Sequence, residues 1–406
     1  MITDNAMTAQ ERRAVGSLAL LYSFRMLGLF MVLPLLALYA ADMPGASPAL
    51  IGLALGIYGL TQALLQIPFG WLSDRVGRKP VIVAGLLVFA LGSVIAATAD
   101  SVWGIVLGRT LQGAGAIAST VMALVADLTS EEQRTKAMAL VGISIGASFA
   151  VAMVLGPAVA AVSGLSGVFW LTAGLAVLGI AVVLLRVPTP PAGVAAHGEA
   201  IAQRRLLGRS FRDGNLARLN IGVFVLHFVL MASFLLVPEF LVDLAGVSRE
   251  RHWLVYLPAL LLSIPAMLPL MIRAERGRRP RSAFLAGIAI VALSVGLLAG
   301  AGSAIMLYVA LWVFFVGFNY LEATLPSLVS RTVFEGGKGT ALGLFSTSQF
   351  LGAFAGGAIG GWLLQYAGPA VLLGLCFVLL IAWWSVAWRS VYPVTPDAAA
   401  AVAGEA

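Results

Sequence analysis

Four ionisable side chains interrupt long apolar stretches of this sequence and are its first candidates for chemistry. They are Arg25, Arg109, His227 and Glu322. A carboxyl group kept away from water favours its neutral, protonated form, so Glu322 is a candidate proton carrier. An imidazole exchanges protons near neutral pH without such help, which makes His227 a second titrating group. Simple structural roles are the alternatives: a hydrogen-bonded core histidine, and a glutamate bound to Asn319 or Tyr320.

The two arginines also have two interpretations each. Arg25 lies near the middle of its apolar stretch, where it would bind an anionic group of a substrate or balance an acid. For Arg109, one interpretation is that it binds backbone carbonyl groups and stiffens the fold. Uncharged polar residues supply further candidates for a substrate cavity: Tyr58, Gln62 and Gln66, which recur every four residues on one helix face, with Gln112, Asn319 and Gln349.

Enzyme and cofactor chemistry is not indicated by any motif. The chain has no H-E-x-x-H, no phosphate-cradling glycine loop and no G-x-G-x-x-G. Its one cysteine, Cys376, lies in an apolar run, and its three histidines are scattered. We therefore predict a protein that is not an enzyme and needs no cofactor or metal.

The apolar stretches that hold these residues are long enough to cross a membrane. The chain has 406 residues, is 60% hydrophobic and only 11% charged, whereas soluble domains are about 25% charged. A bilayer core needs about 20 apolar residues in a helix. Twelve such spans are predicted: 15–40, 49–71, 80–99, 103–126, 135–161, 165–187, 217–241, 253–273, 282–301, 304–329, 339–364 and 369–388. The first and fifth are long, so we expect a tilt, or a kink at Pro34 and Pro157.

The basic residues predict the orientation of these spans. Connections that follow odd-numbered spans carry Arg249 and Arg251 and no other Lys or Arg. Because basic loops stay in the cytoplasm, both termini are predicted to be cytoplasmic. The net charge of +7 then reflects topology and not nucleic-acid binding. The N-terminus does not read as a signal peptide, and Thr8 with Glu11 has capping-box spacing, so a helix is expected to begin near Ala9.

An internal repeat divides the chain into two halves. DRVGRKP at 74–80 aligns with AERGRRP at 274–280, and RTKAMAL at 134–140 aligns with KGTALGL at 338–344. We predict a six-span half at 1–187, a cytoplasmic linker at 188–216, a second six-span half at 217–390 and a short disordered tail at 391–406. Parallel six-helix repeats of this kind frame a substrate path.

GWLSDRVGRKP at 70–80 resembles the cytoplasmic motif that follows the second span in the major facilitator superfamily. LGLFMVLPLL at 27–36 and LGRTLQGAGA at 107–116 resemble the first-helix and fourth-helix motifs of its drug/proton antiporter branch. The fifth-helix motif is degraded to AMVLGPAVAA, where Gly156 and Pro157 remain to bend the helix but three glycines are alanines, which weakens the inference of antiport.

The resemblance implies a latch that holds the two halves together on the cytoplasmic side. Asp74 would face the helix N-terminus near Gly339 and Thr340, Arg78 would pair with Asp127, and Gly77 would allow the turn. The alternative is that the basic residues only hold topology. The full set of implied latch residues is Gly70, Asp74, Arg75, Gly77, Arg78, Lys79 and Asp127. The superfamily fold also places helices 1, 4, 7 and 10 around a central cavity, and these correspond to the spans that carry Arg25, Arg109, His227 and Glu322. Arg109 matches the fourth-helix arginine of the family, and the resemblance implies that it couples protons to transport.

These features together predict a proton-coupled secondary transporter in a bacterial inner membrane that exports small amphiphilic compounds. Its expected partners are a small-molecule substrate, protons and the lipid bilayer, with no nucleic acid, and it is expected to act as a monomer. The alternatives are a proton-coupled importer, a sugar-type efflux protein, sodium in place of protons, or a non-transporting sensor on the same fold. Some relatives carry a soluble C-terminal domain, and we expect regulation through such a domain to be absent here.

Overall fold

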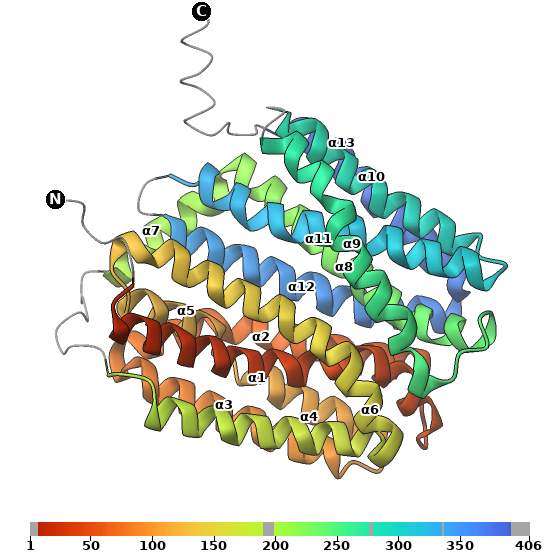
Figure 1. Cartoon of the computed structure of the whole chain (residues 1–406), viewed down its shortest axis with the longest axis horizontal. Coiled ribbons are helices and arrows are strands. Elements are labelled where there is room, and N and C mark those ends of the chain that lie inside the picture. Colours follow the sequence, from red (N-terminus) through yellow and green to blue (C-terminus); the bar gives the residue numbers. More distant parts are fainter. Residues whose placement is uncertain (1–6, 190–198, 276–278, 335–336, 391–406) are drawn as a thin grey trace, which may run out of the picture. The chain divides into compact units, whose positions relative to one another are not determined.

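The computed structural model describes residues 7–189, 199–275, 279–334 and 337–390, and these ranges are helical, with no strand among them (Figure 1). The chain forms two compact units, Met1–Ala200 and Ile201–Ala406. Their boundary falls inside the predicted linker, and the helix α7 (Glu199–Arg212) occupies part of that linker. The predicted tail at 391–406 lies outside the described residues.

The first unit contains six α-helices and one short 3-10 helix within its described residues. They are α1 (Ala9–Tyr39), η1 (Ala40–Asp42), α2 (Pro48–Val76), α3 (Arg78–Ala97), α4 (Val102–Ala114), α5 (Ala118–Asp127) and α6 (Glu131–Leu185). The predicted capping box begins α1, because the Thr8 side chain accepts from Glu11 N–H and the Glu11 carboxylate accepts from Thr8 N–H. Ser47 caps α2 in a similar way, with Pro48 in its first turn.

The predicted spans are present, although the structure departs from separate straight helices in two places. The predicted span 103–126 is broken into α4 and α5, with residues 115–117 between them. The predicted spans 135–161 and 165–187 both lie within α6, where Gly164 has a positive φ of 63° that a side chain would disfavour. The departure from helical geometry in α6 is therefore at Gly164, between the two spans, and the helix continues through Pro157.

The second unit contains the remaining helices of the described chain. After α7 they are α8 (Gly214–Asp243), η2 (Arg249–Arg251), α9 (Trp253–Glu275), α10 (Pro280–Ala299), α11 (Ala304–Thr332), α12 (Lys338–Tyr366) and α13 (Gly368–Trp388). Ten helices of the described chain are long and apolar enough to cross a membrane. If α6 is divided at Gly164 and the broken pair α4 and α5 is included, they correspond to the twelve predicted spans.

Helix packing inside each unit reproduces the repeat that the sequence shows. In the first unit α1 packs on α6, α2 on α4, and α3 on α6. In the second unit the equivalent pairs are α8 with α12, α9 with α11, and α10 with α13. A glycine lies at one of these contacts in each unit: Gly156 of α6 faces the backbone of Met31 on α1, and Gly360 of α12 faces the side chain of Leu235 on α8. Small residues let these helices approach closely without water or large side chains between them.

Candidate functional site

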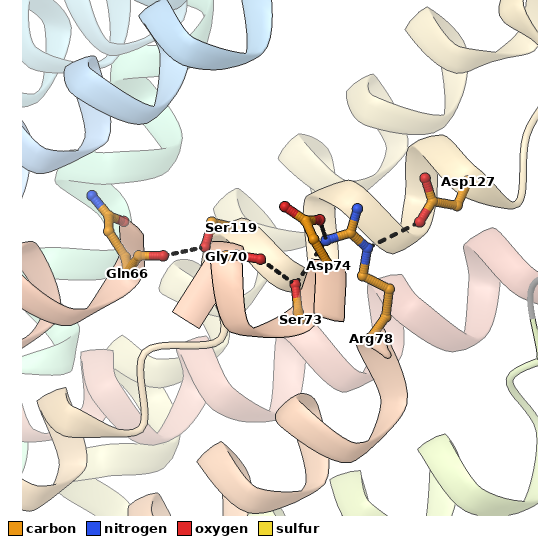
Figure 2. Close-up of polar contacts among 7 residues, drawn as sticks. All are labelled: Gln66, Gly70, Ser73, Asp74, Arg78, Ser119 and Asp127. Carbon is orange, nitrogen blue, oxygen red and sulfur yellow. Dashed lines mark hydrogen bonds and ion pairs between the residues drawn. The ribbon is translucent and has the colours of Figure 1, made fainter. Parts of the chain in front are cut away.

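The predicted latch segment forms a compact polar cluster at the turn from α2 into α3 (Figure 2). Gly77 has a φ of 95°, which glycine adopts readily, so α2 ends there and α3 begins at the next residue. Arg78 then reaches back over the end of α2. Its Nε donates to Asp127 Oδ2 at 3.0 Å and its Nη1 donates to Ser73 Oγ at 2.7 Å and to Asp74 Oδ1. The pairing of Arg78 with Asp127 that the resemblance implies is therefore present.

This cluster ties three helices of the first unit together. Arg78 begins α3, Asp74 lies in the last turn of α2 and Asp127 ends α5. The side chains of Arg78 and Asp127 are 19% and 25% exposed, so solvent only partly screens the pair. A partly exposed ion pair contributes about 1 kcal/mol or less, but an arginine that binds two carboxylates also fixes geometry. The arrangement can hold one carboxylate, that of Asp74, in a defined position at the edge of the unit.

Two serines that the sequence did not single out complete the cluster. Ser73 Oγ donates to the Gly70 carbonyl oxygen and Ser119 Oγ donates to the Gln66 carbonyl oxygen, both at 2.7 Å (Figure 2). Ser73 directly precedes Asp74. A serine in the last turn of a helix often hydrogen-bonds to nearby backbone, and this pattern could have predicted its place in the cluster. Arg75 and Lys79 make no hydrogen bond or ion pair with the described residues, and Arg75 is exposed.

A second polar cluster lies within the second unit and joins three helices there. Gln349 of α12 contacts both proposed titrating groups: its Nε2 lies 2.8 Å from His227 Nε2 on α8 and 3.2 Å from Glu322 Oε1 on α11. The other carboxylate oxygen of Glu322 lies 3.8 Å from His227 Nε2. The sequence placed Gln349 in a substrate cavity, whereas the structure places it between the histidine and the glutamate.

The hydrogen bonds of this cluster assign one tautomer to His227. Its Nδ1 lies 3.1 Å from the Val223 carbonyl oxygen, which can only accept, so Nδ1 carries a proton. In the neutral ring Nε2 then accepts from the Gln349 amide. The Oε2 atom of Glu322 is buried and has no hydrogen-bond partner among the described residues. A proton can therefore reside on this oxygen or on His227 Nε2 without moving any backbone.

Arg109 binds the backbone of its neighbour. It is 1% exposed, and its Nε and Nη2 donate to the carbonyl oxygens of Ala54 and Leu55 on α2 at 3.3 and 3.4 Å. Its Nη1 donates to Gln112 Oε1 at 3.0 Å, and Gln112 Nε2 donates to Ser93 Oγ of α3 at 2.8 Å. Each guanidinium nitrogen of Arg109 has a partner, and the residue joins α4 to α2 and α3.

Arg25 has fewer partners than Arg109. Its Nη2 donates to Gln62 Oε1 at 2.6 Å and to the Gly115 carbonyl oxygen at 3.3 Å. It is 1% exposed, and its guanidinium carbon lies 5.9 Å from the centre of the Tyr58 ring. The acid that would balance Arg25 is not among its partners in the described chain.

The remaining sequence candidates fall into three places. Tyr58, Gln62 and Gln66 are buried along one face of α2, as their spacing predicted. Asn319 does not contact Glu322; its Nδ2 donates to Ser263 Oγ on α9 at 2.8 Å. Gly156 and Pro157 lie inside α6, where Gly156 packs on α1. Among the described residues, no group of three or more His, Cys, Asp or Glu could hold a metal ion.

Comparison with known proteins decides the family. Residues 18–357 match the sequence model of the Major Facilitator Superfamily. The chain belongs to this superfamily. It is a multi-pass membrane protein and a transporter. Its helical fold, with two repeated units, is the fold of this superfamily.

Two relatives in sequence and one solved structure are similar to this facilitator. It is 47% identical over 388 residues to the inner membrane transport protein YajR of Escherichia coli (strain K12), covering 95% of this chain and 85% of that protein. It is 28% identical over 343 residues to the multidrug resistance protein MdtH of Aeromonas hydrophila, covering 84% and 85%. Among solved structures, a bacterial homologue of the human lysosomal transporter Spinster superposes with a TM-score of 0.76 at 15% identity, covering 95% of this chain and 98% of that one. That last likeness concerns the fold alone.

Proposed function

We propose that this facilitator exports small amphiphilic compounds across a bacterial inner membrane in exchange for protons. The observation that carries the proposal is the His227–Gln349–Glu322 cluster. A carboxyl group and an imidazole within the membrane-spanning part of a transporter are expensive to keep there and are best explained by a role in ion movement.

The geometry supports a simple proton cycle for the cluster. Glu322 is the better exposed partner, since 39% of its side chain is accessible against 9% for His227. Glu322 therefore receives the proton first, from water. Loss of its charge weakens its hydrogen bond with Gln349, whose amide then binds His227 alone. Proton release restores the bridge, so the protonation state of one carboxyl changes contacts among α8, α11 and α12.

The relatives support the export direction and the membrane. The chain is similar to multidrug resistance proteins named MdtH, and its more similar relative YajR is named as an inner membrane transport protein. In the positive-inside orientation both termini are cytoplasmic. The latch cluster on Asp74, Arg78 and Asp127 then lies on the cytoplasmic side and steadies one conformation of the alternating cycle. Arg109, which joins α4 to α2, keeps the first half rigid and completes the proposed coupling set.

The test compares the natural chain with Glu322→Gln in proteoliposomes. With an imposed pH gradient, the natural chain should accumulate a transported lipophilic compound against its concentration gradient. Glu322→Gln should abolish this uphill movement, because glutamine cannot bind and release the proton, but should retain exchange of labelled for unlabelled compound. Arg13→Gln is a suitable control, since Arg13 is exposed and belongs neither to the latch residues nor to the cluster on Glu322.

Unchanged uphill accumulation in Glu322→Gln would remove this residue from the mechanism. Accumulation that follows a sodium gradient and ignores the pH gradient would contradict proton coupling.

A further inference from the structure

Arg25 and Gln62 present buried nitrogen donors that have no acceptor among the described residues of the first unit. Arg25 Nε and Nη1 and Gln62 Nε2 are buried and have no hydrogen-bond acceptor among the described residues. The two residues are 1% and 0% exposed. Buried polar groups are almost always paired, so these two side chains call for a partner. Every unpaired atom of the set is a donor, and the partner must therefore be rich in acceptors.

The charge of this region points the same way. Arg109 also approaches Tyr58, with its guanidinium carbon 4.9 Å from the ring centre against 5.9 Å for Arg25, so both cations share one ring. No Asp or Glu lies in the predicted spans 15–40, 49–71, 80–99, 103–126, 135–161 or 165–187. A buried cation is stable only when a counter-charge or a set of acceptors compensates it. The interior of the first half thus carries positive charge without an acid of its own.

The backbone next to Arg25 departs from helical geometry. The fourth span is broken between α4 and α5, and the Gly115 carbonyl oxygen at the break accepts from Arg25 Nη2 at 3.3 Å. Non-helical backbone at membrane depth is tolerated where protein buries it or where it lines a cavity. In secondary transporters, such discontinuous helices typically form the substrate site. Arg25, Gln62 and the break therefore coincide at a place suited to binding.

We propose that Arg25, Gln62 and the break at Gly115 form a subsite for an oxyanion group carried by the substrate. This inference rests on the proposed export of amphiphiles and narrows it to acidic ones, which join a carboxylate, sulfonate or phosphate group to an apolar body. The anion supplies the counter-charge that the first half lacks and the acceptors that its three free nitrogens need. Arg109 is a positioning residue here, because its own nitrogens are already bound to α2 and to Gln112.

Binding without any proton gradient tests the subsite. Thermal unfolding of the purified protein is followed by tryptophan fluorescence while benzoate, benzyl alcohol or benzylammonium is added at constant ionic strength. Each of these three probes contains one phenyl ring, and they differ in the charge of the head group. Benzoate should raise the unfolding temperature of the natural chain, and its apparent affinity should fall roughly tenfold or more in Arg25→Gln, with partial rescue in Arg25→Lys.

The variant Gln62→Glu tests whether a lost response to benzoate could be caused by misfolding instead of by loss of the subsite. The new carboxylate stands where Gln62 Oε1 lies 2.6 Å from Arg25 Nη2, so it provides the counter-charge from within the protein. This variant should lose the response to benzoate while unfolding, without ligand, at the same or a higher temperature than the natural chain. A variant that lost both the response and its stability would not support the proposal.

The other outcomes overturn it. No response to benzoate in the natural chain, an equal response to benzylammonium, or an undiminished response in Arg25→Gln would each do so. Stabilisation by inorganic sulfate but not by benzoate would show a free anion site and contradict the substrate assignment. If benzoate binds as predicted but a pH gradient drives no transport, the subsite stands and the proposed function fails.

Discussion

At the scale of single residues, Arg78 shows how one side chain organises its surroundings. It binds Asp127 and Asp74 together with Ser73, and it owes its position to the left-handed turn at Gly77. The family resemblance implied this pair, since Arg78 lies in the short motif and Asp127 lies at the end of one span. The contact of Gln349 with His227 could not be predicted in that way, since 122 residues separate them and only the packing of α8 on α12 brings them together.

A substitution of Asp74 tests the latch at this scale. Asp74→Asn keeps the shape of the side chain but removes the charge that the resemblance places at the N-terminus of α12, a helix whose first turn has no side-chain cap. Helix N-termini stabilise an anion by about 0.3–2 kcal/mol, so transport should fall by roughly two- to thirtyfold. Uptake assays at matched membrane abundance measure this. Arg13→Gln, at an exposed position outside the latch residues, should behave like the natural chain. Normal transport in Asp74→Asn would contradict the latch.

At the scale of helices, glycine faces set how closely α8 and α12 pack. A Cβ atom at Gly356 would come within 2.7 Å of the Phe228 Cα atom, and one at Gly352 within 2.8 Å of the Phe224 Cα atom. Both glycines lie in the run GAFAGGAIGG at 352–361, and small residues of this kind allow close packing of membrane helices. The hydropathy of the sequence did not predict the break of the fourth span or the single helix through the fifth and sixth spans. Hydropathy indicates how long an apolar segment is, but not whether its backbone hydrogen bonds are continuous.

Gly356→Ala tests this packing. The added methyl group must push α12 away from the backbone of α8, and overpacking of this kind costs about 1–3 kcal/mol. The temperature of thermal unfolding should therefore fall, and the His227–Gln349 contact between the same two helices should loosen. Gly374→Ala is the control, because Gly374 lies on α13 with open space around its Cα. Equal stability of the two variants would show that the glycine face does not limit the approach of the helices.

At the scale of the whole molecule, the number of spans, the two repeated halves and the family follow from the sequence. Apolar run length fixes the spans, and the superfamily match over residues 18–357 agrees with them. The two halves differ in the ionisable residues that their spans hold: the first holds Arg25 and Arg109, which are buried, and the second holds the buried His227 with the partly exposed Glu322. Sequence reasoning found these four residues, but only side-chain geometry separates the satisfied Arg109 from the unsatisfied Arg25.

Proton-coupled export is the central claim, and everted membrane vesicles test it most directly. Respiration acidifies their interior, a quenched dye reports the pH gradient, and lipophilic compounds with anionic, neutral and cationic head groups are then added. With the natural chain, a transported compound should dissipate the gradient, because each inward movement releases protons outward. Vesicles that contain Glu322→Gln at equal abundance should show no such release. If no compound dissipates the gradient, or if Glu322→Gln dissipates it as well as the natural chain, proton-coupled export through Glu322 is contradicted.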